Sequence, residues 1–221
     1  DGVYHQNISI VGNVFRNIRN TSTRLYNYKN VLVSQNSISN SGTGIRCYTL
    51  LTSGYLANNG VKTEPIPKNH NYNIIIRQNW LASIKSASAI YALGSARRPI
   101  YNLKIERNSI NGAVLRGIRV SDYCVNTSVT WNAINNAFSG GIVVEGTSNG
   151  SSIERNTVSG CGSNGITVSG TIRNVKVRNN TVKSSKGNGI LINDRAMNTV
   201  VSGNKVSGAE KSGILVSSYS K

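Results

Sequence analysis

Residues 174–193 read NVKVRNNTVKSSKGNGILIN, and residues 150–169, one copy earlier, read GSSIERNTVSGCGSNGITVS. Asparagine recurs at intervals of 24 residues, at Asn108, Asn132, Asn156, Asn180 and Asn204. Gly-Ile pairs keep the same interval and begin at Gly117, Gly141, Gly165, Gly189 and Gly213. Two independent series that share one period indicate that this part of the chain is built from internal repeats.

Aliphatic residues follow the same interval, for example at Ile105, Val129, Ile153, Val177 and Val201. Shorter versions of the phrase lie nearer the amino terminus at irregular spacing, around Asn13, Asn36 and Asn79. Each copy alternates apolar and polar residues over short runs, which is typical of short strands joined by tight turns. We therefore predict an all-β solenoid of about eight coils, in which coils about 4.8 Å apart bury continuous Val and Ile columns.

The two most regular residues have structural explanations. A glycine before each Ile suits a turn with positive φ or a close approach of two backbones. The recurring asparagine suits a left-handed turn position, or it stacks its side-chain amide along the solenoid axis. We therefore assign both series to the fold and look for function among the side chains that point outward.

The period near 24 residues, with the motifs N-x-[IV] and G-I-x-[IV], resembles the β-helix of pectate lyases, polysaccharide epimerases and hydrolases, and phage tailspikes. The resemblance extends over nearly the whole chain, and it implies a single-stranded, right-handed parallel β-helix with residues 1–221 as one domain. It implies no particular reaction, because the motifs lie at core and turn positions that many chemistries share. The sequence has no acidic cluster suited to calcium, and we predict no metal and no cofactor.

Composition narrows the choice of partners. The 221 residues include 25 Lys and Arg against 8 Asp and Glu, a formal charge of +17, so a polyanion is the expected partner. No recognition helix or zinc finger indicates specific nucleic-acid binding, and nonspecific polyanion binding stays open as an alternative. No apolar run is long enough to cross a bilayer, and no membrane partner is expected. The three cysteines form no CxxC motif, and Cys47 is predicted to point into the core.

Strand phrases begin within a few residues of the first residue and end just before the last, so no cap is visible at either end. Exposed strand edges invite association. We therefore expect a fragment of a longer protein, or a homo-oligomer, for which a trimer is one form. Three apolar residues at one outward position fit an interface between subunits, namely Val143, Leu191 and Leu215.

The same outward position gives the leading candidate site, because its N-terminal half is basic and aromatic, with Arg46, Tyr91 and Arg119. Insertions at residues 48–72 and 93–101 leave the solenoid just after this strand and are expected to flank it. Arginine pairs with carboxylate or sulfate, and aromatic rings stack on sugars, so this groove is predicted to bind an acidic polysaccharide. The predicted substrate-binding residues are Arg46, Tyr48, Lys68, His70, Tyr91, Arg97, Arg98, Arg119 and Tyr123.

Two reactions are open for this groove. A polysaccharide lyase needs a cation at the uronate carboxylate and a base for the adjacent proton. The groove offers Arg46, Arg119 or Lys68 as the cation, and Tyr91, His70 or a desolvated arginine or lysine as the base. A glycoside hydrolase needs two carboxyl groups instead. Asp122 and Glu145 follow the groove strand on adjacent coils and are the candidates for this pair. The predicted catalytic residues are Tyr91, Arg119, Asp122 and Glu145.

A second pair of acids, Glu106 and Glu154, shares one outward column two coils apart. Basic residues adjoin both, so solvated cross-strand ion pairs explain them better than catalysis does.

These expectations combine into one functional hypothesis. The chain is predicted to bind and depolymerise an acidic extracellular or cell-surface polysaccharide, as part of a tailspike-like or secreted protein. The alternative is a non-catalytic β-helix shaft or adhesin that forms an oligomeric interface. Either function places the protein outside the cell, secreted or in a virion tail.

Overall fold

The structure is a computed structural model that describes residues 5–26, 28–49 and 71–218, and within these residues every named strand belongs to one of three parallel sheets. Sheet A consists of β1 (His5–Val11), β4 (Tyr28–Ser34), β7 (Asn71–Arg77), β10 (Ile100–Tyr101), β11 (Lys104–Glu106), β14 (Cys124–Val125), β15 (Ser128–Thr130), β18 (Ser152–Glu154), β21 (Lys176–Arg178) and β24 (Val200–Ser202).

The other two sheets have one strand in each coil. Sheet B consists of β2 (Val14–Arg16), β5 (Ser37–Ser39), β8 (Trp80–Ile84), β12 (Ser109–Ala113), β16 (Ala133–Ala137), β19 (Thr157–Ser159), β22 (Thr181–Lys183) and β25 (Lys205–Ser207). Sheet C consists of β3 (Thr21–Tyr26), β6 (Thr43–Tyr48), β9 (Ile90–Leu93), β13 (Arg116–Ser121), β17 (Gly140–Glu145), β20 (Ile166–Ser169), β23 (Ile190–Ile192) and β26 (Ile214–Val216).

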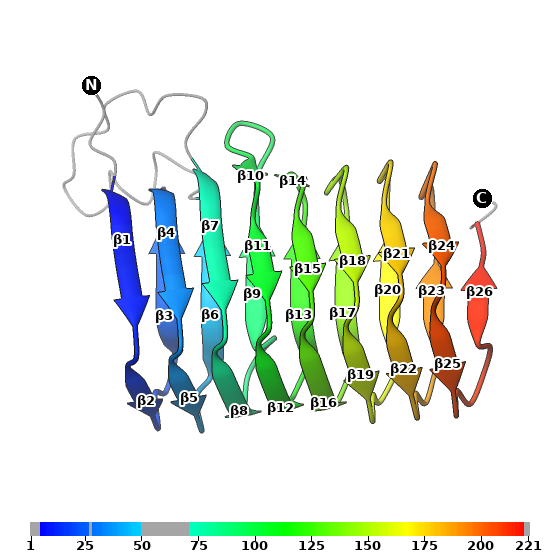
Figure 1. Cartoon of the computed structure of the whole chain (residues 1–221), viewed down its shortest axis with the longest axis horizontal. Coiled ribbons are helices and arrows are strands. Elements are labelled where there is room, and N and C mark those ends of the chain that lie inside the picture. Colours follow the sequence, from blue (N-terminus) through cyan, green and yellow to red (C-terminus); the bar gives the residue numbers. More distant parts are fainter. Residues whose placement is uncertain (1–4, 27, 50–70, 219–221) are drawn as a thin grey trace.

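The chain winds through sheets A, B and C in turn, and each strand pairs with its counterpart one coil earlier and one coil later (Figure 1). Eight such circuits run from β1–β3 at the N-terminal end to β24–β26 at the C-terminal end. The predicted all-β solenoid of about eight coils is therefore confirmed.

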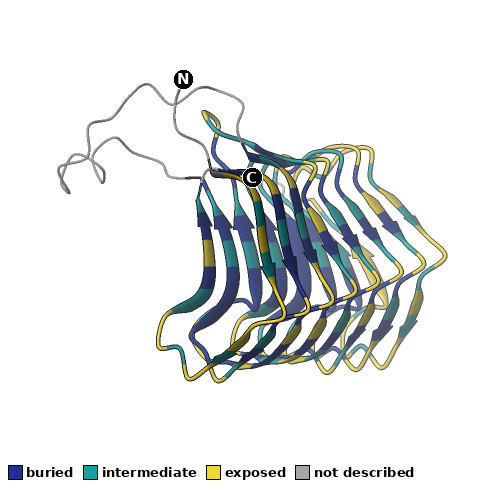
Figure 2. Cartoon of the chain, turned by 60° about the vertical axis from the view of Figure 1, so that its left-hand side comes forward, coloured by how far each residue is buried: buried dark blue, intermediate teal, exposed yellow. Residues whose placement is uncertain are grey.

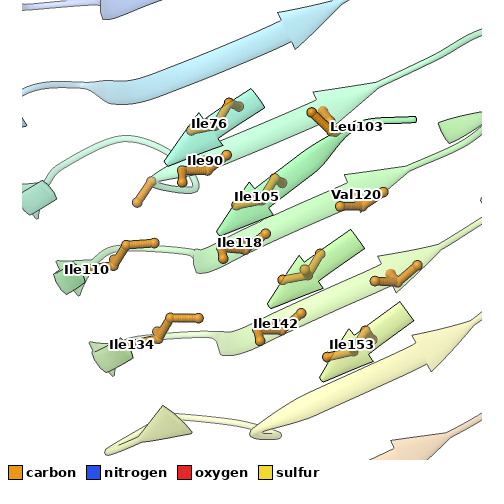
Figure 3. Packing of buried hydrophobic residues seen from close by; sticks show 14 of the residues in the cluster. Ile76, Ile90, Leu103, Ile105, Ile110, Ile118, Val120, Ile134, Ile142 and Ile153 are labelled. Carbon is orange, nitrogen blue, oxygen red and sulfur yellow. The ribbon is translucent and has the colours of Figure 1, made fainter. Parts of the chain in front are cut away.

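Apolar side chains that point inward stack in columns, one from each coil. Backbone register aligns Ile118 with Ile142 and Ile142 with Ile166, and all three are fully buried. Figure 3 shows the same stacking for Ile110 and Ile134 on sheet B. Buried residues line the interior and exposed residues concentrate at the turns (Figure 2). Burial of these columns is the main stabilising contribution, at roughly 25 cal/mol per Å² of apolar surface.

The asparagine series forms a buried ladder at the corner between sheets A and B. The side-chain oxygen of Asn132 accepts hydrogen bonds from the backbone N–H and the Nδ2 of Asn108, both at 3.0 Å. The Nδ2 of Asn132 donates to the backbone oxygens of Ile105 and Thr130 and to Oδ1 of Asn156. The pattern runs from Asn13 to Asn204, so the asparagines stack their amides. The left-handed position belongs to the residue before each ladder asparagine, such as Arg107 with φ 54°.

The glycine of the Gly-Ile pair is required by close approach. A Cβ on Gly141 would lie 2.3 Å from Cγ1 of Val158 and 2.5 Å from the backbone oxygen of Gly165. Gly141 is not among the residues with positive φ, so backbone strain does not explain it. The absence of a side chain lets sheet C pack directly on the core residues of sheet B.

The sequence assigns residues 93–101 to an insertion, and in the structure residues 94–99 connect two strands. Leu93 ends β9, and β10 pairs with β7 and β14. A tight turn remains between them, closed by two backbone hydrogen bonds between Ser95 and Arg98. Of the predicted insertion at 48–72, Tyr48 belongs to β6 and residues 71–72 to β7, while residues 50–70 lie outside the described part.

Replacing Gly141 with alanine is expected to lower the free energy of unfolding by about 1–3 kcal/mol, because the added methyl overpacks the Val158 contact. The matched control is Gly213→Ala, because a Cβ there meets its nearest atom only at 4.0 Å. Urea unfolding followed by circular dichroism measures both. Equal stability of the two variants would contradict the close-packing explanation.

Replacing Asn132 with alanine removes the acceptor of two buried donors on Asn108. We expect a loss of at least about 2 kcal/mol in the free energy of unfolding, because buried donors are left without partners. The control is Asn111→Ala, which changes an exposed residue of sheet B and should change the free energy of unfolding by less than about 0.5 kcal/mol. If both variants lose the same stability, the ladder contributes no more than a surface amide.

Candidate functional site

The outward position of sheet C forms one continuous column along the solenoid. Backbone register aligns one residue per coil, namely Arg24, Arg46, Tyr91, Arg119, Val143, Thr167, Leu191 and Leu215. The sequence predicts this order from Arg46 onward, and the register confirms it. Strand alternation explains the placement, because Ile45 and Cys47 on either side of Arg46 are buried in the core.

Arginine and tyrosine side chains contact one another over the N-terminal coils of this column. The Arg46 guanidinium carbon lies 4.3 Å from the ring centroid of Tyr48 and 5.8 Å from that of Tyr91. The Arg119 guanidinium carbon lies 4.9 Å from the Tyr91 ring. Tyr91 therefore contacts two cations from neighbouring coils, each an attraction of about 0.5–2 kcal/mol.

The first coil extends this arrangement. Arg24 lies 6.0 Å from the Tyr26 ring, and the rings of Tyr26 and Tyr48 are 6.1 Å apart. Tyr48 and Tyr91 meet edge to face at 5.4 Å. We name this surface the arginine–tyrosine face and define it by Arg24, Tyr26, Arg46, Tyr48, Tyr91 and Arg119.

Arg46 is the most confined cation of the face. Burial lowers the pKa of its guanidinium, and the neighbouring Arg24 charge lowers it further, although arginine stays charged at neutral pH. Among the described residues, its Nε atom is buried and has no hydrogen-bond partner. A guanidinium held between two tyrosine rings, and without a carboxylate partner among the described residues, favours an anion as its ligand.

Arg119 is paired with an acid of the next coil. Its guanidinium forms an ion pair with Glu145, in which Nε donates to Oε1 at 2.5 Å. The Ser121 hydroxyl donates to the same oxygen, also at 2.5 Å. Glu145 therefore neutralises the positive charge of Arg119 at the C-terminal end of the face. Within the described ranges this is the only ion pair closer than 4 Å, which leaves Arg24 and Arg46 without a carboxylate partner there.

The predicted pair of catalytic acids has unequal surroundings. The register partner of Glu145 is Ser121, and Asp122 follows it beyond the end of β13 with φ 40°. The backbone N–H of Asp122 donates to the backbone oxygen of Glu145, so the two residues lie on adjacent coils. The Glu145 carboxylate is bound by Arg119 and Ser121 through its Oε1 atom, and this pairing with a cation favours its charged form.

Three of the remaining predicted binding residues, Arg97, Arg98 and Tyr123, lie in turns that follow strands of sheet C. Arg97 lies in the turn after β9 that Ser95 and Arg98 close. Tyr123 lies in the adjoining turn of the next coil, with φ 46°, and its backbone N–H donates to the Thr147 hydroxyl. The predicted residues Lys68 and His70 lie outside the described part of the chain.

Two expectations about outward residues need correction. Val143 is only 6% exposed and Leu191 is half-buried, so of the three apolar residues only Leu215, at 37%, is exposed. Val143 is the register partner of Arg119 and lies two residues before Glu145, so the ion pair adjoins it. The ion pairs expected for Glu106 and Glu154 are also absent among the described residues.

The described part of the chain also has a hollow outside the arginine–tyrosine face. This hollow, of about 470 Å³, lies at the turn between sheets B and C, where Ile84, Val114 and Phe138 contribute to its lining. In the described residues, no three His, Cys, Asp or Glu side chains are grouped so that they could share a metal ion. The described ranges also contain no helix with the length and apolarity to span a bilayer.

Comparison with known proteins identifies the family. A family model described as the right handed beta helix region matches residues 66–221. The chain belongs to the right-handed β-helix family. Among solved structures it is similar to the surface protein and adhesin PfbA of Streptococcus pneumoniae, with a TM-score of 0.53 and 13% identity over 96% of this chain and 67% of that chain. No curated protein matches the chain.

This family membership confirms the right-handed parallel β-helix that the sequence resemblance implies. At 13% identity, the similarity to PfbA shows the fold alone. The family match therefore explains the core and the turns. The arginine–tyrosine face has to be explained from the outward residues of this chain.

Sequence reasoning missed two residues of the face, Arg24 and Tyr26. Their strand lacks the Gly-Ile pair that identifies the equivalent strand in later coils, because Ser22 and Thr23 occupy those positions. The signal that could have identified them is the alternation of Arg24, Leu25 and Tyr26, which repeats the order Arg46, Cys47, Tyr48.

All three cysteines of the β-helix are free and buried. Burial raises the pKa of the Cys47 thiol to about 12 and that of Cys161 to about 11, and it also raises the pKa of Cys124. We expect the folded protein to react only slowly with a thiol reagent at about pH 8, because the thiolate is the reactive form. After unfolding in denaturant, all three thiols should react with the reagent. A thiol that reacts at once in the folded state would contradict this packing.

Proposed function

We propose that this chain is an adhesin-like, extracellular β-helix that binds an acidic polysaccharide along the arginine–tyrosine face. The observation that carries the proposal is the series of cation–ring contacts among Arg46, Tyr48, Tyr91 and Arg119 on consecutive coils. These contacts place guanidinium groups and aromatic rings along one line parallel to the solenoid axis. A line of repeated groups fits a polymer with repeated acidic sugars.

The chemistry of the face supports the polymer class. Guanidinium groups pair with carboxylate or sulfate in a bidentate geometry, and tyrosine rings stack on sugar rings while their hydroxyls stay in water. Arg46 is already partly desolvated, so an anion that binds it meets less competition from water. The overall charge of +17 adds long-range attraction for a polyanion.

An extracellular, adhesin-like role is supported by the ion pair beside the face and by a solved structure of similar fold. Beside the face, Glu145 is bound to Arg119 in an ion pair, which fits binding without cleavage. The solved neighbour PfbA is described as a surface protein and adhesin, which makes the same use of a β-helix our first hypothesis for this chain. A homo-oligomer with Leu191 and Leu215 at its interface remains part of the proposal.

Depolymerisation by a lyase reaction is the second candidate function. The observation that favours it is the Tyr91 ring, which contacts the guanidinium groups of both Arg46 and Arg119. One cation would neutralise the uronate carboxylate, and Tyr91 as phenolate would remove the proton beside it. The glycosidic C–O bond would break as the carbon–carbon double bond forms, and the phenol so generated would return its proton to the leaving oxygen. Tyr91→Phe tests this step, because it removes the phenol oxygen and keeps the ring.

The binding test measures the affinity of the full chain for heparin, alginate and hyaluronan, with neutral dextran as the control polymer. Arg46→Ala should weaken binding of the acidic polymers roughly 10-fold or more, because a charge-assisted hydrogen bond of about 1.5–3 kcal/mol is lost. The matched control is Lys176→Ala, which removes one exposed charge from sheet A. That variant should bind within about two-fold of the parent, as rim charges do.

Equal losses in Arg46→Ala and Lys176→Ala would contradict a specific face and favour nonspecific attraction by net charge. Thermal melting of both variants checks that the fold survives. In the same incubations, new reducing ends report cleavage, and ultraviolet absorbance of unsaturated uronate products reports a lyase. Products that form with the parent and vanish with Tyr91→Phe would establish the second candidate, and binding without products supports the first.

A further inference from the structure

Both tryptophans of the chain lie at one corner of the solenoid, where sheet A turns into sheet B. Trp80 is the first residue of β8, and Trp131 lies in the turn between β15 and β16. Their side chains are 47% and 54% exposed. Two large exposed rings at the same corner form an apolar surface that the core does not need.

The register sets the spacing of the two rings. Trp80 pairs with Ser109, and Ser109 pairs with Ala133, which follows Trp131 by two residues. The two tryptophans are therefore two coils apart, or roughly 10 Å along the axis at the usual strand spacing. That separation is comparable to the advance of two sugar units in an extended polysaccharide.

Trp131 has a backbone conformation that bulky residues rarely adopt. Its φ is 59°, in the left-handed region. The equivalent turn position of the other coils holds smaller or more flexible side chains, namely Gly12, Gln35, Gln78, Arg107, Arg155, Asn179 and Gly203. A strained residue that the surrounding fold keeps in place is a candidate for a functional role.

The asparagine ladder holds the Trp131 backbone rigidly. The N–H of Trp131 donates to the backbone oxygen of Glu154 at 3.2 Å. The Nδ2 of Asn132 donates to the backbone oxygen of Thr130, so the residues on both sides of Trp131 are tied together. The ring is therefore presented to solvent from a fixed backbone, which reduces the entropy lost when a ligand binds.

Two arginines accompany the rings. The Arg155 guanidinium carbon lies 5.3 Å from the Trp131 ring, and Arg107 occupies the same turn position one coil before Trp131. Two acids lie nearby on sheet A, Glu106 and Glu154, and the Glu154 carboxylate accepts a hydrogen bond from the Ser152 hydroxyl. Within the described part of the chain, neither arginine is in an ion pair with a carboxylate.

We propose that this corner, the tryptophan corner of Trp80, Arg107, Trp131 and Arg155, is a second binding site for an acidic polysaccharide. The indole rings stack on the apolar faces of two sugar units, and the guanidinium groups pair with carboxylate or sulfate groups of the same polymer. The bound chain runs parallel to the solenoid axis. The site lies on a different corner from the arginine–tyrosine face and shares only the class of polymer with the proposed function.

Tryptophan emission tests the corner separately, because the chain has two tryptophans and both lie here. The full chain is titrated with heparin, alginate and hyaluronan, with dextran as the neutral control. Binding at the corner should change the emission and protect it from acrylamide quenching with at least one acidic polymer. The change should persist in Arg46→Ala, which separates this site from the arginine–tyrosine face. Unchanged emission with all three acidic polymers would overturn the proposal.

Substitutions that introduce the residue found at the equivalent position of other coils are expected to keep the fold intact. Trp131→Gly copies Gly12 and Gly203, and Trp80→Thr copies Thr157 and Thr181 at the same register position. We expect an unchanged or higher melting temperature for Trp131→Gly, because the left-handed position suits glycine. Affinity for the acidic polymer should fall about ten-fold in each variant.

The control variant is Phe138→Ser, which removes an aromatic ring that is 77% exposed at the turn between sheets B and C. It should leave polymer affinity unchanged. Parent-like affinity in both tryptophan variants would overturn the proposal. An equal loss in Phe138→Ser would also overturn it, because the loss would then follow from any exposed aromatic ring.

Discussion

The buried asparagine ladder is the interaction on which the rest of the structure depends. From Asn36 to Asn204, each amide oxygen accepts two hydrogen bonds from the preceding coil. From Asn13 to Asn180, each Nδ2 donates to the next asparagine and to at least one backbone oxygen. An amide buried without these partners would cost several kcal/mol, so a shifted register at one coil is strongly disfavoured. The ladder thereby fixes the Val and Ile columns inside and the sequence of side chains outside.

Because the interior is fixed by repetition, function is left to the outward positions. On sheet C, the outward residue changes from arginine and tyrosine in the first coils to threonine and leucine in the last. At the corner between sheets A and B, a tryptophan stands where other coils place glycine, glutamine, arginine or asparagine. Neither change alters the core, so each surface can bind a ligand without a cost to the packing beneath it.

The sequence predicts most of the fold because the fold is periodic. The interval between Asn132 and Asn156 also separates Ile118 from Ile142, so the repeat alone places these two residues in one inward column. The predictions that failed depend on contacts of individual side chains or on a coil without the repeat motif, and the repeat period specifies neither. Val143 is buried because the chain arranges Arg119 and Glu145 beside it, and Arg24 was missed because its strand lacks the Gly-Ile pair.

The direction of the bonding has a mechanical consequence. Every ladder bond and every sheet bond between coils points along the solenoid axis, so each coil is attached only to the coil before it and the coil after it. Tension on the polypeptide would detach coils one at a time, beginning with an outermost coil, and each detached coil would lengthen the molecule by about two dozen residues of extended chain. Under such tension a β-helix of this kind would dissipate force in small steps, while the coils that remain keep their outward side chains in place.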